Sequence, residues 1–116
     1  MSLQPVLIDG KWRASDAVGE FEAINPSTKT ALPETYPVSS AAEVEAAIHA
    51  GYEAAVALRT MSPEAIACFL EACADSIEAR TGALVDLAHA ETALPKSPRL
   101  RDVELPRTTD QLRQAA

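Results

Sequence analysis

The sequence is poor in aromatic residues and glycine, and each shortage limits what the chain can be. Aromatic residues make up 4% of the 116 residues, so the 47% of hydrophobic residues are mostly alanine, with leucine, isoleucine and valine. This composition favours closely packed helices over a thick aromatic core. Four glycines leave little room for a phosphate-binding loop, and neither G-x-G-x-x-G nor G-x-x-x-x-G-K-[ST] is present.

The chain also lacks a basic surplus, a long apolar run and a secretory signal. Seventeen acidic residues against ten basic ones give a net charge of −7, which disfavours binding to nucleic acid. No stretch approaches the length of a membrane-spanning helix, and the N-terminus has no basic region followed by an apolar run. We therefore expect a cytoplasmic protein that binds neither nucleic acid nor membrane.

Residues that commonly carry chemistry are few and isolated. The two cysteines, Cys68 and Cys73, fall in one predicted helix and lie too far apart there to form a disulfide, so both are interpreted as core or semi-core residues. His49 and His89 have no second ligand at metal-binding spacing. Nothing near Cys68 in the sequence would activate it as a nucleophile. The residues themselves thus indicate no catalytic, cofactor-binding or metal-binding site.

Residues 1–39 are predicted to form a short β-hairpin and extended segments. Asp9-Gly10 separates Val6–Ile8 from Lys11–Arg13, which is a strong signal for a tight hairpin turn. Phe21–Ile24 is a second extended run, and the sequence Asn-Pro-Ser-Thr after it predicts a turn. A third extended segment covers residues 32–38, where two prolines restrict it to a sheet edge.

Residues 40–116 are predicted to form about four helices. A capping box at Ser40 and Glu43 starts the first helix, Ser62-Pro63 starts the second, and the third ends at Pro95. Pro106 is expected to kink the last helix near Glu104-Leu105. Glu43, Glu45 and Glu53 are interpreted as a solvated face. The side chains expected to face inward are Val44, Ile48, Ala55, Leu58, Ile66, Phe69, Leu70, Cys73, Ile77, Leu84, Leu87, Ala88, Leu94, Leu100, Val103 and Leu112.

The order of these features resembles the amino-terminal segment of the aldehyde dehydrogenase superfamily. Members commonly have an I-N/D-G-x-W hairpin, an N-P-x-T-G turn, two long helices and an E-T-G-x-P segment. The corresponding residues here are Ile8–Trp12, Ile24–Thr28 and Glu91–Pro95. The resemblance implies an α/β parent in which residues 1–39 and 40–116 belong to one incomplete NAD(P)-binding domain. The chain itself would be mostly α-helical with a short N-terminal hairpin.

A narrower resemblance concerns one branch of that superfamily. H-A-E-T-A-L-P at residues 89–95 and R-T-T-D-Q-L-R at residues 107–113 are similar to motifs of α-ketoglutaric semialdehyde dehydrogenases and of some NADP-linked fatty-aldehyde dehydrogenases. Lys29 and Ala93 stand where the family usually has glycine. Because turn glycines usually serve a positive φ, these two turns are expected to differ or to be strained. Pro106 also departs from the family pattern.

The resemblance implies a parent that oxidises an aldehyde to a carboxylic acid with NAD or NADP. In the family, the cysteine nucleophile, the glutamate base and the nucleotide-binding turn all lie beyond the length of this chain, so this fragment is expected to be inactive and to bind no cofactor. Some members bind a monovalent cation with backbone carbonyls and an acidic side chain. The matching positions are Ala23, Ile24 and Glu104, and Glu104 is favoured as a plain surface residue.

Three interpretations follow from these observations. The first is a fragment of an NAD(P)-dependent aldehyde dehydrogenase, whose partners would be the remainder of that chain in a homo-oligomer. The predicted last helix has no C-terminal cap, which suggests a longer protein and so favours the fragment interpretation. The second is a non-catalytic helical interaction module derived from the family, and the length of the source reading frame separates it from the first. The third, an unrelated acidic helical adaptor, does not explain the ordered motifs.

The isolated chain is expected to expose apolar area along Ile66, Phe69 and Ile77 or along Leu100, Val103 and Leu112, and to self-associate.

Overall fold

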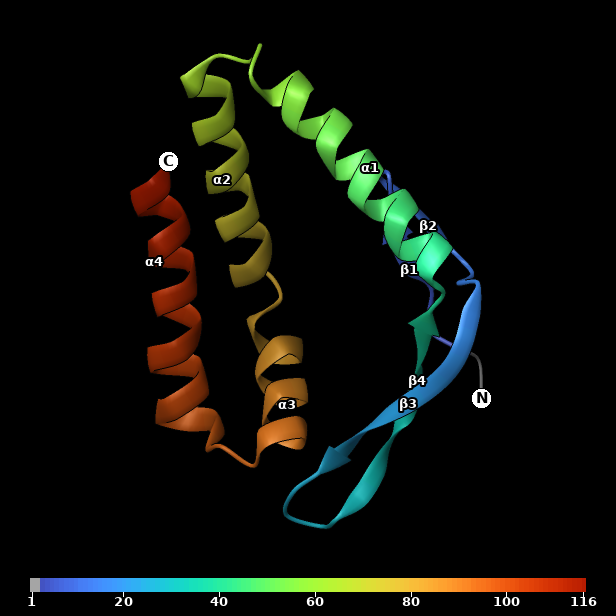
Figure 1. The fold of residues 1–116 in the computed structure, drawn as a ribbon. Coiled ribbons are helices and arrows are strands. Elements are labelled where there is room, and N and C mark those ends of the chain that lie inside the picture. The colour runs from blue at the N-terminus through green and yellow to red at the C-terminus, as the bar shows by residue number, and fades with distance from the viewer. Residues whose placement is uncertain (1–2) are drawn as a thin grey trace. The chain divides into compact units, whose positions relative to one another are not determined.

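The computed structural model describes residues 3–116, which fall into two compact units. The first unit runs from the N-terminal residues to Ile24 and continues with Thr30–Thr60, whereas the second comprises Asn25–Lys29 and Met61–Ala116. The strands end at Ser39 and the first helix begins at Ala41, before the first unit ends at Thr60. The first unit therefore contains strands as well as one helix (Figure 1).

The first unit begins with the hairpin that the sequence predicts. Strands β1 (Val6–Ile8) and β2 (Lys11–Arg13) are antiparallel, and Val6 pairs with Arg13. Asp9 and Gly10 join them with φ values of 53° and 70°, the left-handed conformation that this type of two-residue turn requires. The prediction for this segment is therefore confirmed.

A second two-stranded sheet follows, formed by β3 (Ala17–Asn25) and β4 (Thr30–Ser39). Both strands are longer than the extended runs predicted from the sequence, and their pairing was not predicted. The turn between them is as expected, because Asn25 Oδ1 accepts hydrogen bonds from the backbone N–H groups of Ser27 and Thr28. The two prolines of β4 are tolerated because a two-stranded sheet leaves each strand an open edge.

Helix α1 (Ala41–Leu58) completes the first unit. Ser40 caps it as predicted, since its Oγ accepts a hydrogen bond from the Glu43 N–H at 3.2 Å. The predicted inward stripe is wrong within this unit, because Val44, Ile48 and Leu58 are all exposed. The covered side of the helix instead carries the buried Glu43, with Ala47 and Ala50 half-buried. The strand that contacts α1 is β1, whose three residues are too few to cover an apolar stripe along the whole helix.

The second unit consists of helices. These are α2 (Pro63–Glu78), α3 (Thr81–Thr92), the segment η1 (Lys96–Glu104), in which Ser97 is extended, and α4 (Leu105–Ala115). Ser62 Oγ accepts from the Ala65 N–H, so the predicted cap of α2 is confirmed. The predicted kink beside Pro106 stays a prediction: η1 gives way to α4 at this point, but Glu104 and Leu105 keep helical backbone angles, and the non-helical residue of η1 is Ser97. Helices α2 and α4 lie side by side (Figure 1).

The core of the second unit differs in part from the predicted one. Leu100 is buried as expected, but Phe69 is 64% exposed and Val103 is 46% exposed. Sequence periodicity missed Val85 and Thr109, which are each 1% exposed. Leu84, Leu87 and Leu94 were also expected inside and are exposed. The exposed members of the predicted stripes lie on helix faces that the other described elements of this unit leave open.

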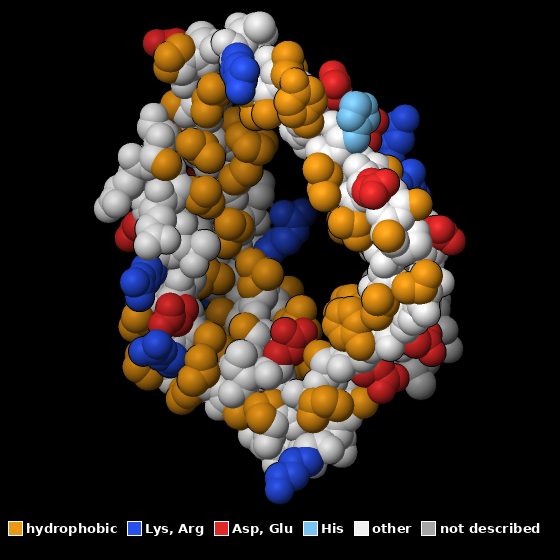
Figure 2. Space-filling view, viewed as in Figure 1, with side chains coloured by type: hydrophobic (Ala, Val, Ile, Leu, Met, Phe, Trp, Pro, Cys, Tyr) orange, Lys and Arg blue, Asp and Glu red, His pale blue; other side chains and the backbone are white. Residues whose placement is uncertain are grey.

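Large apolar side chains are exposed in both units, and Figure 2 shows hydrophobic side chains over much of the visible surface. This is more exposed apolar surface than the scattered single residues of an ordinary protein surface. None of the helices in residues 3–116 is long and apolar enough to cross a membrane.

Candidate functional sites

The two cysteines are separate free thiols. Cys68 is exposed on α2, which corrects its interpretation as a core or semi-core residue, while Cys73 is half-buried as expected. The predicted apolar face of α2 passes through Cys73, and Cys68 lies outside it. No histidine or carboxylate among the described residues is hydrogen-bonded to the Cys68 thiol, so the usual partner of a nucleophilic cysteine is not in place.

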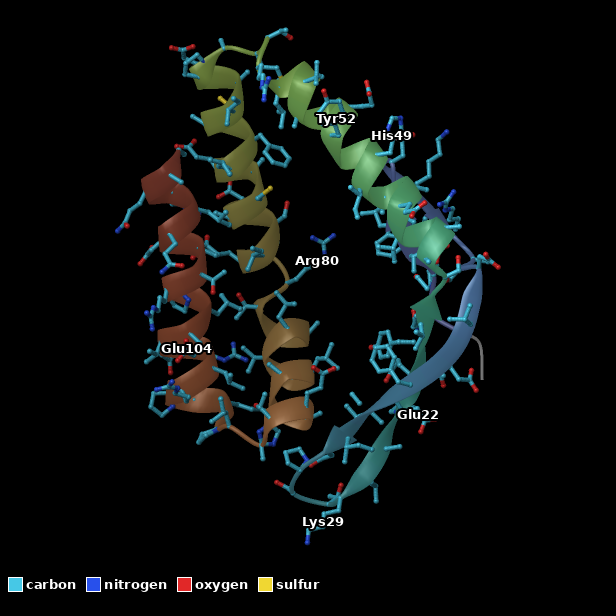
Figure 3. The ribbon with its side chains drawn as sticks, in the orientation of Figure 1. Glu22, Lys29, His49, Tyr52, Arg80 and Glu104 are labelled. Carbon is cyan, nitrogen blue, oxygen red and sulfur yellow. The ribbon has the colours of Figure 1, made fainter. Side chains whose placement is uncertain are left out.

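Both histidines are exposed and lie in different units. His49 projects from α1 (Figure 3). His89 is in the last turn of α3, where its Nδ1 lies 2.7 Å from the backbone oxygen of Leu94. This contact satisfies a carbonyl beyond the helix end, which is a structural role.

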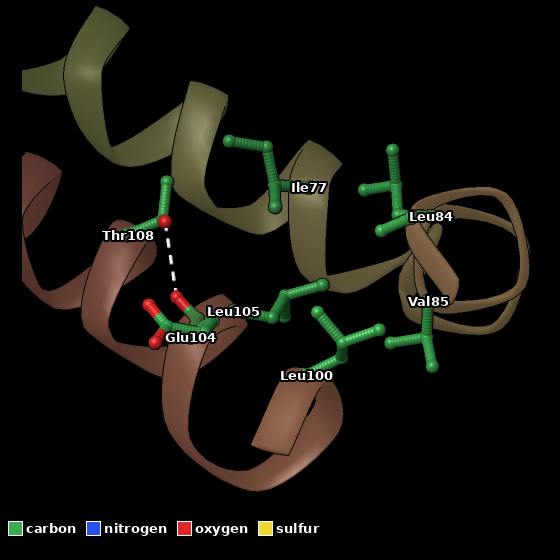
Figure 4. Close-up of a pocket in the computed structure, with 8 residues that line it drawn as sticks. Ile77, Leu84, Val85, Leu100, Glu104, Leu105 and Thr108 are labelled. Atoms are coloured by element: carbon green, nitrogen blue, oxygen red, sulfur yellow. Dashed lines mark hydrogen bonds between the residues drawn. The ribbon is translucent and has the colours of Figure 1, made fainter. Parts of the chain in front are cut away.

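Glu104, the acidic residue of the candidate cation site, has a different partner in the structure. Its carboxylate forms an ion pair with Arg99 at 2.5 Å, and its backbone oxygen accepts from Thr108 Oγ1 at 3.0 Å (Figure 4). Ala23 and Ile24 belong to the other unit, so the cation site stays a prediction. Residues 3–116 contain no group of three histidine, cysteine or acidic side chains placed to hold a metal ion.

A cavity of about 350 Å³ lies between α2, α3, η1 and the start of α4 (Figure 4). Its lining is almost entirely apolar, and polar groups enter only through Glu104 and Thr108 at one side. The apolar lining consists of Ile77, Leu84, Val85, Ala88, Leu100 and Leu105. Such a cavity suits an apolar group, and it contains no paired acid and base that could carry a reaction.

A polar cluster in the first unit surrounds Glu43, which is only 6% exposed. The Ser15 hydroxyl donates to Glu43 Oε2 at 2.5 Å, and the Asp16 N–H donates to Oε1 at 3.1 Å. The hydroxyl of Ser15, then that of Ser39, and more weakly the Asp16 N–H and Arg13 hold the pKa of the Glu43 carboxyl below its usual range. Glu43 is therefore not part of a solvated face. It also fails to complete the predicted capping box, because its carboxylate bonds to the Ser15–Asp16 segment instead of the Ser40 N–H.

An ion-pair cluster in the second unit joins α2 to α4. Arg113 donates through Nη1 to Glu78 at 2.6 Å and through Nη2 to Asp75 at 2.8 Å. The guanidinium group holds the pKa of Glu78 below its usual range. Sequence analysis did not find this cluster, although Arg113 is the last residue of the R-T-T-D-Q-L-R motif.

Comparison with solved structures identifies the fold. The chain aligns with an aldehyde dehydrogenase from Bartonella henselae with a TM-score of 0.87 and 21% identity, covering 97% of this chain and 24% of that one. An NAD-dependent benzaldehyde dehydrogenase from Corynebacterium glutamicum gives a TM-score of 0.84 at 18% identity, covering 96% of this chain and 24% of that one. The fold is therefore that of an amino-terminal part of an aldehyde dehydrogenase, and the predicted fold class is confirmed.

Sequence comparison establishes the family. Residues 12–116 match the model of the aldehyde dehydrogenase family, so the chain belongs to that family. It is also 37% identical over 114 residues to α-ketoglutaric semialdehyde dehydrogenase 2 of Azospirillum brasilense. That match covers 97% of this chain and 21% of the relative, so the chain spans about a fifth of the relative's length. The resemblance inferred from the ordered motifs is confirmed.

None of the four glycines, all within the described residues 3–116, lies in a turn that leads from a strand into a helix. A cradle for the phosphates of a dinucleotide needs glycines in a turn between a strand and a helix N-terminus. Gly10 is in the β1–β2 turn, Gly19 is within β3 against Val38, and the other two glycines lie inside α1 and α3. The first turns of α1 and α2 carry Glu43 and Glu64, whose charges would repel a phosphate.

Proposed function

We propose that this chain is the amino-terminal structural segment of an NAD(P)-dependent aldehyde dehydrogenase, and that it is inactive alone. The observation that carries the proposal is the family match over residues 12–116. The exposed Cys68, without a base beside it, supports the view that the chemistry belongs to the rest of the enzyme. The segment would contribute folded structure to the parent, with NADP or NAD bound by other parts of it.

The proposed substrate of the parent is α-ketoglutaric semialdehyde or a related aliphatic aldehyde, which is oxidised to the carboxylic acid. Two features support this choice: the 37% identity to the Azospirillum brasilense semialdehyde dehydrogenase, and the motifs at residues 89–95 and 107–113. The benzaldehyde dehydrogenase from Corynebacterium glutamicum is only 18% identical, so its likeness bears on the fold alone.

The proposed partner is the remainder of an aldehyde dehydrogenase chain, in a cytoplasmic homo-oligomer. The exposed apolar side chains of both units support this, because Phe69, Ile48 and Val103 would otherwise face water. The chain alone is expected to self-associate. Light scattering that gives a clean monomer, with no binding of a hydrophobic dye, would contradict this expectation.

A chimeric enzyme tests the proposed function. The matched segment of the Azospirillum brasilense relative is replaced by this chain, and NAD or NADP reduction is measured with α-ketoglutaric semialdehyde. The chimera is expected to be folded and active, whereas the relative without its segment should be inactive. A chimera that is folded but inactive would instead favour the non-catalytic interaction module. The purified chain alone should reduce neither cofactor with any aldehyde.

A further inference from the structure

Three separate segments of the first unit meet at one carboxylate. Residues 15–16 link β2 to β3, residues 39–40 end β4 and lead into α1, and Glu43 lies in the first turn of α1. Ser15 and Asp16 hold the two carboxylate oxygens of Glu43, as described above. Ser40 adds two bonds to Asp16, one from its hydroxyl to Oδ2 and one from its N–H to the backbone oxygen, each 3.0 Å long.

The group at this junction is suited to a negative charge. Glu43 lies at the N-terminus of an 18-residue helix, where the helix dipole favours an anion. Both of its oxygens accept hydrogen bonds, so the ionised form is fully satisfied although it is buried. The charged groups around it are Arg13 at the end of β2 and Asp16 in the following link. We call Ser15, Asp16, Ser40 and Glu43 the Glu43 latch.

We propose that the ionised Glu43 carboxylate fastens the link between the two hairpins to the first turn of α1, and that loss of its charge releases this link. The β1–β2 hairpin immediately precedes the latch in the chain and contacts α1 through β1. Release of residues 15–16 therefore loosens the hairpin as well. The latch concerns the fold of this chain and does not depend on the proposed function.

The chemistry sets the direction of the pH dependence. When Glu43 is protonated, one of its two oxygens carries a proton and becomes a donor. That oxygen then faces another donor, either the Ser15 hydroxyl or the Asp16 N–H, and the hydrogen bond to it is lost. Because the folded pKa of Glu43 is lowered, its stabilising effect is present above the ordinary glutamate pKa. The effect is lost as the pH falls through the folded pKa. The latch is closed at neutral pH and opens in acid.

Hydrogen exchange of the 116-residue chain at neutral pH tests the latch. Glu43→Gln is expected to lose amide protection in residues 6–16 and in the first turn of α1. Glu45→Gln removes the same charge from an exposed position two residues along α1 and is expected to keep the wild-type protection. Equal protection in the two variants would overturn the proposal. So would a loss in Glu43→Gln that is spread evenly over both units.

The wild-type protein gives an independent measurement should Glu43→Gln fail to fold. The Asp16 amide proton donates to Glu43, so its NMR chemical shift is expected to follow Glu43 as the pH is lowered, and the β1–β2 resonances should broaden together with it. In Ser15→Ala, which removes the strongest donor, this transition is expected at higher pH. An Asp16 amide that does not titrate, or a transition unmoved by Ser15→Ala, would contradict the latch.

Discussion

In the first unit the buried side chains are polar, whereas the second unit has a small apolar core. Thr35 and Glu43 are buried among the described residues of the first unit, and Ala74, Val85 and Leu100 are the buried hydrophobic residues of the second. The first unit is thus held by directed hydrogen bonds around a carboxylate, and the second by burial of apolar area together with the Arg113 cluster. The comparison teaches that an apolar stripe in the sequence, such as that of α1, forms a core only where another element of the fold covers it.

The largest expected effect is from a substitution in the core of the second unit. Leu100 is 7% exposed, and Leu100→Ala should reduce the free energy of unfolding by about 2–3 kcal/mol, because it removes buried methyl groups next to an existing cavity. Urea unfolding measures the change. Val103→Ala on the same segment is the matched control and should stay within about 0.5 kcal/mol of the wild type, since Val103 is exposed. Similar losses in both variants would mean that the second unit has no distinct core.

A smaller effect of opposite sign is expected where the sequence lacks a family glycine. Ala93 follows α3 with φ of 60°, and Lys29, which is labelled in Figure 3, ends the β3–β4 turn with φ of 58°. Ala93→Gly should raise the free energy of unfolding by about 0.5–1 kcal/mol, because glycine adopts this conformation without a Cβ penalty. Ala90→Gly, inside the same helix, is the control and should lower it by a similar amount. Lys29→Gly should raise the free energy of unfolding in the same way, and if neither Lys29→Gly nor Ala93→Gly stabilises the chain, the turns are unstrained.

The smallest effect is expected from the ion pairs between α2 and α4, because their side chains are partly exposed. Arg113→Lys keeps the charge but loses the two-pronged geometry, so it should lower the Tm less than Leu100→Ala does. Arg107→Lys, at an exposed position on α4, should leave the Tm unchanged. The pKa of Glu78 is lowered in the folded chain. The stabilisation by the Arg113–Glu78 ion pair is therefore present above the ordinary glutamate pKa, and it is lost as the pH falls through the pKa of Glu78 in the folded chain. Arg113→Lys should therefore weaken the acid dependence of the Tm; an unchanged dependence would contradict this role.

Much of the local structure could be predicted because it depends on neighbouring residues. The structure contains the turn at Asp9-Gly10 and the helix caps at Ser40 and Ser62, because these residues determine the local backbone through the conformations and hydrogen bonds they allow. At Lys29 and Ala93, where the family usually has glycine, the sequence leaves open whether the turn differs or is strained, and the structure keeps a positive φ at both positions.

The tertiary contacts were less predictable because they depend on what covers each surface. Glu43 was read as a solvent-facing residue, but its partners Ser15 and Asp16 lie 28 and 27 positions earlier in the sequence. Val85 and Thr109 are buried by neighbouring segments that periodicity within one helix does not specify. Phe69 and Leu84 are exposed because an apolar stripe predicts a buried face only where a second element covers it.

The central claim is that this segment contributes structure and no reacting group to a dehydrogenase. The most direct test is to introduce Cys68→Ser, His49→Gln and His89→Gln together into the active chimera and to measure kcat for the oxidation of α-ketoglutaric semialdehyde. The expected result is a kcat equal to that of the unmodified chimera, because none of these side chains would touch the substrate. A large loss of kcat in a variant that still folds and binds its cofactor would contradict the claim.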